Sequence, residues 1–271
     1  LYIIGNFEDP WFREEQARKK SKIKPRQDEI KEGYDELLSR QISLTWTPLY
    51  RESADSFIIS FFNVNSLNAH IKDVQSDYSI LASDVVFFID TRLKVGEEPV
   101  LPDLSFQSSI YMKKTQHVAG GISMYVKPSN NVSNISDIHV EEEAYHCSVL
   151  SASVSNFIVI GVYISPKCHK KVMISCLEKA LASCDSYVNV VVGGDFNTEE
   201  DIDLFLVNGF KRLPLESTSI HGSKIDQIYV KSGLTTKSGV NPSYYSDHHP
   251  TFVILNPAEN HDTGDRLSKL I

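Results

Sequence analysis

The chain of 271 residues carries a formal net charge of −8, and 41% of its residues are hydrophobic. That hydrophobic share is typical of a globular domain with a sizeable core, and the length suits one large α/β domain with an appendage. No stretch approaches the roughly 20 apolar residues of a membrane-spanning helix, so no membrane partner is expected. The acidic charge excludes a protein that coats nucleic acid nonspecifically, because such binding needs many basic contacts with phosphate.

The first 55 residues differ in texture from the rest of the chain. Residues 11–42 mix charges of both signs with few apolar residues, and Pro25 interrupts them. We therefore expect residues 1–55 to form a charged arm or linker and residues 257–271 to form a short tail. The chain begins with Leu1, and no basic segment precedes an apolar one, which predicts a nuclear or other intracellular protein that is not secreted.

Eight short runs rich in Val, Ile, Phe and Tyr predict β-strands. They lie within residues 56–67, 84–93, 120–128, 147–154, 156–166, 188–197, 224–232 and 250–255. Several are apolar at consecutive positions, which indicates strands covered on both faces. Residues 169–184 instead carry an apolar stripe at helical spacing, formed by Val172, Cys176, Leu177 and Leu181. The pattern favours two sheets packed face to face with helices outside.

Polar side chains follow several of these apolar runs. They are Asn63, Asn65, Asp90, Asp195, Asn197, Asp226 and Asp247. Side chains two residues apart on a strand share a face, so Asp195 and Asn197 are expected to point into the same volume, as are Asn63 and Asn65. Each residue alone is explained equally well by a turn or a helix cap. Together with His248 they supply oxygen ligands for a hard divalent cation and a group that can manage a proton.

Six motifs carry a resemblance to a known family. NVNSL, IDTRL, GVYISP, GGDFNT, KIDQIYV and SDHHP occur in the order and approximate spacing of the endonuclease/exonuclease/phosphatase family, from about Ser56 to Leu255. GGDFN and SDHHP are the most specific of these motifs. That family includes pancreatic DNase, apurinic-site endonucleases and the nucleases of non-long-terminal-repeat retrotransposons. The resemblance implies an α/β fold over residues 56–256, a four-layer αββα sandwich of two packed mixed β-sheets flanked by helices, with Mg²⁺ or Mn²⁺ as cofactor.

The resemblance also implies a role for each matching residue. Asn65, Asp90 and Asp247 match metal-binding positions. Among the catalytic positions, Asn63 matches the asparagine that supports the site, and Tyr163 matches a tyrosine that contacts phosphate. Asp195 matches the carboxylate that orients or deprotonates the attacking water, and Asn197 matches the partner of that carboxylate in the transition state. Asp226 matches the acid that hydrogen-bonds the catalytic histidine, here His248. His248 rather than His249 follows Ser-Asp directly and is the expected catalytic histidine.

One position departs from the family pattern. The family has glutamate where this chain has Asp90, and aspartate is shorter by one C–C bond, about 1.5 Å. A shorter carboxylate predicts a weakened metal ligand. The favoured interpretation is a metal-dependent nuclease, and the alternative is a degenerate, noncatalytic module that binds nucleic acid or protein. A phosphatase of small phosphorylated molecules is a second enzymatic alternative, although its extended motifs are not recognised here.

The expected partner is nucleic acid, with DNA favoured. LYIIGNF at the start of the chain resembles the stretch that follows the last conserved motif in helicases of Helitron-type transposons, some of which carry a nuclease of this family. This resemblance implies an upstream helicase portion and a mobile-element origin. A basic rim suited to a polyanion is expected from Arg92, Lys113, Lys114 and Lys167, with Lys170 and Lys171 beside them, unless these are ordinary solvated side chains.

Overall fold

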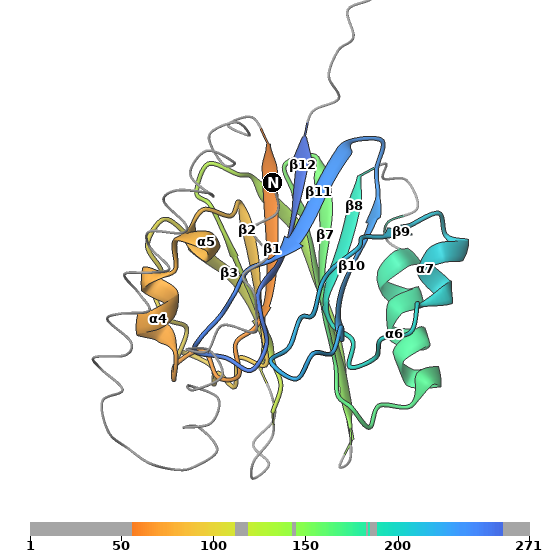
Figure 1. The fold of residues 1–271 in the computed structure, drawn as a ribbon, viewed down its shortest axis with the longest axis horizontal. Helices are drawn as coiled ribbons and strands as arrows, with labels where there is room; N and C mark the ends of the chain where they lie inside the picture. Colours follow the sequence, from red (N-terminus) through yellow and green to blue (C-terminus); the bar gives the residue numbers. More distant parts are fainter. Residues whose placement is uncertain (1–55, 112–118, 143–144, 183, 185–188, 257–271) are drawn as a thin grey trace, which may run out of the picture.

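The computed structural model describes residues 56–111, 119–142, 145–182, 184 and 189–256. The predicted arm over 1–55 and tail over 257–271 lie outside these residues. Within them, two six-stranded sheets pack face to face, and helices lie on the outer face of each sheet (Figure 1). The predicted four-layer αββα sandwich is confirmed. Among the described helices, none combines the length and apolar character needed to span a bilayer.

The first sheet has a mixed strand arrangement. In spatial order it contains β11 (Thr235–Val240), β12 (Thr251–Asn256), β1 (Phe57–Asn63), β2 (Val85–Ile89), β4 (Ile122–Val126) and β3 (Ser105–Ile110). Strands β1 and β2 run parallel, and the other neighbouring pairs run antiparallel. Because Asn63 pairs in register with Ile89, the carboxyl ends of β1 and β2 lie side by side.

The second sheet repeats this plan. In spatial order it contains β5 (Val132–Glu141), β6 (His146–Val154), β7 (Phe157–Ile164), β8 (Val190–Asp195), β10 (Asp226–Lys231) and β9 (Lys211–Arg212). Strands β7 and β8 are parallel, and the other neighbouring pairs are antiparallel. Asp195 therefore lies in register with both Tyr163 and Asp226, which brings polar residues from three strands to one end of this sheet.

Helices cover the outer face of each sheet. The first sheet is covered by α4 (Ile71–Ser76) and α5 (Tyr78–Leu81), and the second by α6 (Lys170–Ala182) and α7 (Asp203–Val207) (Figure 1). Helix α6 occupies the predicted segment, but Val172 is only partly buried, and Met173 and Ala180 extend the buried face instead. Side chains between the two sheets form the central core, which includes Phe61, Phe87 and Val191.

Two glycines let the sheets approach closely at their centre. A Cβ on Gly193 would lie 2.4 Å from the ring of Phe61, and one on Gly161 would lie 2.3 Å from the ring of Phe87. The two phenyl rings stack with centroids 5.5 Å apart. Glycine is therefore required at these points because the opposing rings fill the space of a side chain. The packing accounts for the first glycine of the GGDFN motif.

All eight predicted strands are present, as β1, β2, β4, β6, β7, β8, β10 and β12. The sequence reading missed β3, β5, β9 and β11, and each of these lies at an edge of its sheet. An edge strand is covered less completely than a central one, so its sequence lacks the continuous apolar run that revealed the others. Strand β5, for example, is exposed or only partly buried along its length.

Candidate active site

The two sheets meet through a direct hydrogen bond at the carboxyl ends of their parallel strands. Asn63, the last residue of β1, donates from Nδ2 to Oδ2 of Asp195, the last residue of β8, over 2.8 Å. Both side chains are buried, with Asp195 only 1% exposed. The polar endings of β1 and β8 thus form one cluster rather than two separate turns.

The chain leaves the extended conformation immediately after these strands. Asn65 and Asn197 have φ values of 50° and 49°, so each lies in a left-handed turn just beyond its strand, and the shared face of an extended strand does not account for its position. Asparagine adopts this left-handed conformation more readily than most residues. Asn197 instead folds back, its backbone N–H donating to Oδ1 of Asp195 over 2.9 Å and its Nδ2 donating to the carbonyl of Ile164 over 2.8 Å. Two donors therefore fix the Asp195 carboxylate, namely Nδ2 of Asn63 and the backbone N–H of Asn197.

The segment before β12 brings a second acid to the end of β1. Asn65 donates from Nδ2 to Oδ1 of Asp247 over 3.1 Å. Ser246 anchors the segment by donating from its hydroxyl to the carbonyl of Asn63 over 2.8 Å and by accepting the N–H of His248 over 3.2 Å. The sequence reading missed Ser246, although its place in the SDHHP motif was a usable signal.

His248 lies between two carboxylates. Its Nδ1 is 2.9 Å from Oδ2 of Asp226, and its Nε2 is 4.0 Å from Oδ2 of Asp195. The neighbouring His249 is fully buried, and its Nδ1 accepts the N–H of Ser243 over 3.1 Å. Burial lowers the pKa of His249 to about 4, which keeps this ring neutral. The geometry thus assigns the ion pair to His248.

The electrostatics of this group separate an acid from a base. Burial lowers the pKa of His248, but the charge and hydrogen bond of Asp226, with a contribution from Asp195, outweigh burial and raise that pKa to about 10. Burial, followed by the charge of Asp226, raises the pKa of Asp195 to about 7. At pH values between these two, His248 is an imidazolium and Asp195 a carboxylate. Such a pair can donate a hydrogen bond to an anion and accept a proton from water.

Asp90 and Arg92 form an ion pair beside this cluster. Arg92 donates from Nε to Oδ1 of Asp90 over 3.3 Å and from Nη2 to Oδ2 over 2.8 Å, and the N–H of Gly120 also donates to Oδ1. Burial raises the pKa of Asp90, the bonds to Arg92 and Gly120 oppose that effect, and the charge of Asp247 adds to it. The charge of Asp247 therefore acts on Asp90. Arg92, which was expected to contact substrate as part of the basic rim, is instead paired with Asp90.

Tyr163 lies near the end of β7, beside Asp195 of the neighbouring strand. It pairs in register with Asp195 and is only 4% exposed. Burial, and then the charges of Asp90 and Asp195, raise the pKa of its hydroxyl, which stays protonated and able to donate to an anion. The ring of His146 lies 5.0 Å from the ring of Tyr163, between centroids. The sequence reading missed His146, because a single histidine at the start of a strand gives no signal.

The predicted lysines of the basic rim are placed only in part. Lys167 is exposed three residues beyond β7, and Lys170 and Lys171 are exposed in the first turn of α6. Lys113 and Lys114 lie outside the described residues. Lys167 follows the same strand end as Tyr163, which is consistent with a position near the mouth of the site.

The oxygen ligands predicted for a metal suit a hard divalent cation. Asn65 donates its amide hydrogen to Asp247, which leaves its carbonyl oxygen as an acceptor, and Asp90 and Asp247 add carboxylates whose mutual repulsion a cation would relieve. A second set has ligand atoms within 4.8 Å of one another, namely Asp195, Asp226 and His248. An imidazolium has no lone pair for a metal, so the charged state of His248 argues against this second set.

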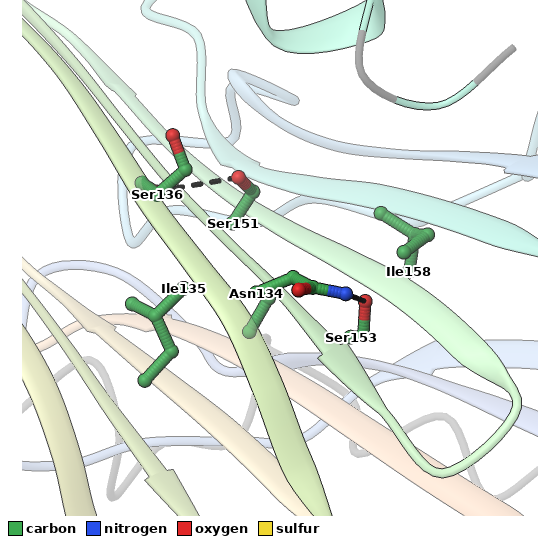
Figure 2. Close-up of a pocket in the computed structure, with 7 residues that line it drawn as sticks. Asn134, Ile135, Ser136, Ser151, Ser153 and Ile158 are labelled. Atoms are coloured by element: carbon green, nitrogen blue, oxygen red, sulfur yellow. Dashed lines mark hydrogen bonds between the residues drawn. The ribbon is translucent and has the colours of Figure 1, made fainter.

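A separate pocket of about 360 Å³ is lined by residues of β5, β6 and β7 (Figure 2). It opens where the pairing of β5 with β6 shifts register, and Asn134 donates to Ser153 on its wall over 3.2 Å. Its lining residue Ile158 stands five residues from Tyr163 along β7, roughly 17 Å at about 3.4 Å per residue. Its lining contains none of the polar strand endings, so this pocket is distinct from the candidate active site.

Comparison with solved structures identifies the same architecture in several hydrolases. The chain is similar to the 3′ phosphatase NExo from Neisseria bound to a product DNA hairpin, with 17% identity, a TM-score of 0.57, and coverage of 74% of this chain and 100% of that one. An AP endonuclease from Archaeoglobus fulgidus matches with 14% identity, a TM-score of 0.53, and coverage of 74% and 100%.

A family protein from Bacteroides thetaiotaomicron matches with 13% identity, a TM-score of 0.55, and coverage of 74% of this chain and 98% of that one. At these identities the likeness shows the fold alone. No curated protein sequence matches the chain. The family profile described as Endonuclease/Exonuclease/phosphatase family matches residues 61–248, which span the polar cluster from β1 to His248. The chain belongs to the endonuclease/exonuclease/phosphatase family.

Proposed function

We propose that this protein is a metal-dependent phosphodiesterase that acts as a DNA endonuclease. The observation that carries the proposal is the arrangement around Asp195. This buried carboxylate is held by Asn63 and Asn197 and lies 4.0 Å from the imidazole of His248. Hydrolysis of a phosphodiester needs a base for water and a positive group for the phosphate oxygens, and this cluster offers both.

The geometry of the cluster supports a role in phosphodiester hydrolysis for each of its residues. Asp195 accepts a proton from the attacking water, because its pKa of about 7 makes it a carboxylate that can still take up a proton near neutral pH. His248 stays charged through Asp226 and donates a hydrogen bond to a nonbridging phosphate oxygen. The hydroxyl of Tyr163 donates a hydrogen bond to the same phosphate group. Asn197, turned toward the end of β7, supports the carboxylate from its backbone.

A divalent cation, Mg²⁺ or Mn²⁺, would be held by the side-chain oxygens of Asn65, Asp90 and Asp247. When bound, it would neutralise charge on the phosphate and on the leaving group. The charge effect of Asp247 on Asp90 supports their assignment to one metal site. The shorter Asp90 reduces the reach of this site and predicts a modest activity.

DNA is the proposed substrate, and Arg92 and Lys167 are the proposed contacts with its backbone, together with Lys113 and Lys114. The DNA hairpin bound by the similar Neisseria phosphatase supports nucleic acid as the substrate class. The resemblance of LYIIGNF to Helitron helicases supports a nuclease of a mobile genetic element with an upstream helicase portion, acting in the nucleus or elsewhere inside the cell.

The test is cleavage of supercoiled plasmid, single-stranded DNA and RNA with Mg²⁺ or Mn²⁺, or with EDTA. We expect metal-dependent cleavage of DNA by the wild type and none by Asp195→Asn, which preserves the shape of the side chain and removes its charge. Binding of DNA without cleavage under every metal condition would overturn the proposal in favour of a noncatalytic binding module.

A further inference from the structure

We propose that Arg92 and the divalent cation compete for the carboxylate of Asp90, and that a guanidinium displaced by the cation then binds a phosphate of the DNA. Metal binding thereby prepares the site for its substrate. The inference rests on the proposed function, because it assumes that the cation binds at Asp90.

The acceptor positions of Asp90 are nearly filled by the protein itself. An ionised carboxylate offers about four lone-pair positions. Three donors reach it, namely the N–H of Gly120, Nε of Arg92 at 3.3 Å and Nη2 of Arg92 at 2.8 Å. A cation at the remaining position would lie beside a guanidinium of the same sign. The two positive groups therefore cannot share Asp90 without repulsion, and binding of one weakens binding of the other.

The backbone holds the two side chains together. Asp90 and Arg92 have φ values of 53° and 54°, in the left-handed region, and the N–H of Arg92 donates to the carbonyl of Gly120 over 2.9 Å. This double turn folds the guanidinium back over a carboxylate only two residues away. The pairing is thus a property of the turn that follows β2.

Arg92 differs from Asp90 in its freedom to move. The Asp90 side chain is 6% exposed and the Arg92 side chain is 41% exposed, so the carboxylate is fixed while the guanidinium borders solvent. The negative charge of Asp247 acts on Arg92, which places the guanidinium within the electrostatic reach of the site. Released from Asp90, it has the bidentate geometry that suits a phosphate.

Linked binding makes the inference measurable without cleavage. If Arg92 and the cation exclude each other, removing the guanidinium must tighten metal binding, by the roughly 5- to 150-fold range that is usual for coupled sites. The same residue must also add to DNA affinity only when metal is present, because without metal it stays on Asp90.

The experiment measures Mn²⁺ binding to the full chain by electron paramagnetic resonance, without DNA. We expect tighter binding in Arg92→Gln, a smaller gain in Arg92→Lys, which keeps the charge but loses the bidentate fork, and no change in Arg212→Gln. Arg212 is the matched control because it forms a surface ion pair with Asp201. Adding Asp90→Asn to Arg92→Gln must abolish the gain, which assigns the effect to Asp90.

A second readout tests the release of Arg92. DNA binding is measured by fluorescence anisotropy in a His248→Ala background, which prevents turnover. Arg92→Gln must weaken DNA binding with Mn²⁺ present and leave it unchanged with EDTA. Equal Mn²⁺ affinity in wild type and Arg92→Gln, or equal loss of DNA affinity with and without metal, overturns the inference and leaves the proposed function intact. Absence of Mn²⁺ binding in both proteins overturns the inference and the metal site of the proposed function together.

Discussion

Nδ1 of His248 lies 2.9 Å from Oδ2 of Asp226, and this contact joins the segment before β12 to the first residue of β10. Strands β12 and β10 belong to different sheets, so the pair forms only when the sandwich closes. Its consequence is electrostatic, because the carboxylate holds the imidazole in its charged form.

The first prediction concerns the dependence of activity on pH. The proposed mechanism needs Asp195 deprotonated and His248 protonated, so kcat/KM should rise through about pH 7 and fall through about pH 10, following the two pKa values. Asp226→Asn removes the carboxylate that raises the pKa of His248. The alkaline fall should therefore move to lower pH, and a kcat/KM profile of both proteins would show the shift. An alkaline limb in the same place in both would exclude this role of Asp226.

The second prediction concerns the orientation of Asp195. Asn63→Ala removes the donor 2.8 Å from Oδ2, so the carboxylate loses one of its two fixing contacts. Misorientation of a reacting group lowers turnover more than binding, so kcat should fall by roughly 100-fold with little change in KM. Asn134→Ala is the control, since it removes an asparagine hydrogen bond in the distant pocket. A similar loss in both variants would point to general destabilisation instead.

The third prediction uses the shortened carboxylate at position 90. Asp90→Glu lengthens the side chain by about 1.5 Å, which should improve its reach to a cation. Metal-dependent cleavage should increase, and the Mg²⁺ concentration that gives half-maximal rate should fall. Rates measured against Mg²⁺ for wild type, Asp90→Glu and Asp90→Glu with His248→Ala give the answer.

The gain from Asp90→Glu should disappear in the double variant, because a better metal ligand cannot replace His248. DNA binding without metal should barely change, since basic side chains supply that attraction. If none of the three proteins cleaves while all bind DNA, the site is noncatalytic.

The fourth prediction concerns stability. A Cβ on Gly193 would come within 2.4 Å of the Phe61 ring, so Gly193→Ala must push apart the two sheets or the stacked rings. Overpacking of this kind costs typically about 1–3 kcal/mol. Chemical denaturation should show a loss in that range for Gly193→Ala and little loss for Gly233→Ala, where nothing lies within 4 Å of the added carbon. Equal stability of the two variants would show that the sheets yield easily at this point.

The sequence alone determined the centre of each sheet and the chemical character of its end. A strand covered on both faces must be apolar at consecutive positions, so β2, β7 and β8 were readable from composition and order. The edge strands could not be predicted in the same way, because each has a neighbouring strand on one side only. Strand β5 carries polar residues as a result. The polar residues after the apolar runs were equally visible, although a turn or a helix cap explains each of them when it is taken alone.

Only the tertiary structure decided what those polar residues do to one another. Asn65 and Asn197 leave their strands through left-handed turns, which a two-residue alternation cannot predict. The sequence predicts Arg92 as a substrate contact, but in the structure the turn after β2 places its guanidinium on the carboxylate of Asp90. The pKa values of Asp195 and His248 also depend on burial and on charges brought together from separate strands. Burial and charge act through space, and distance along the chain carries no information about them.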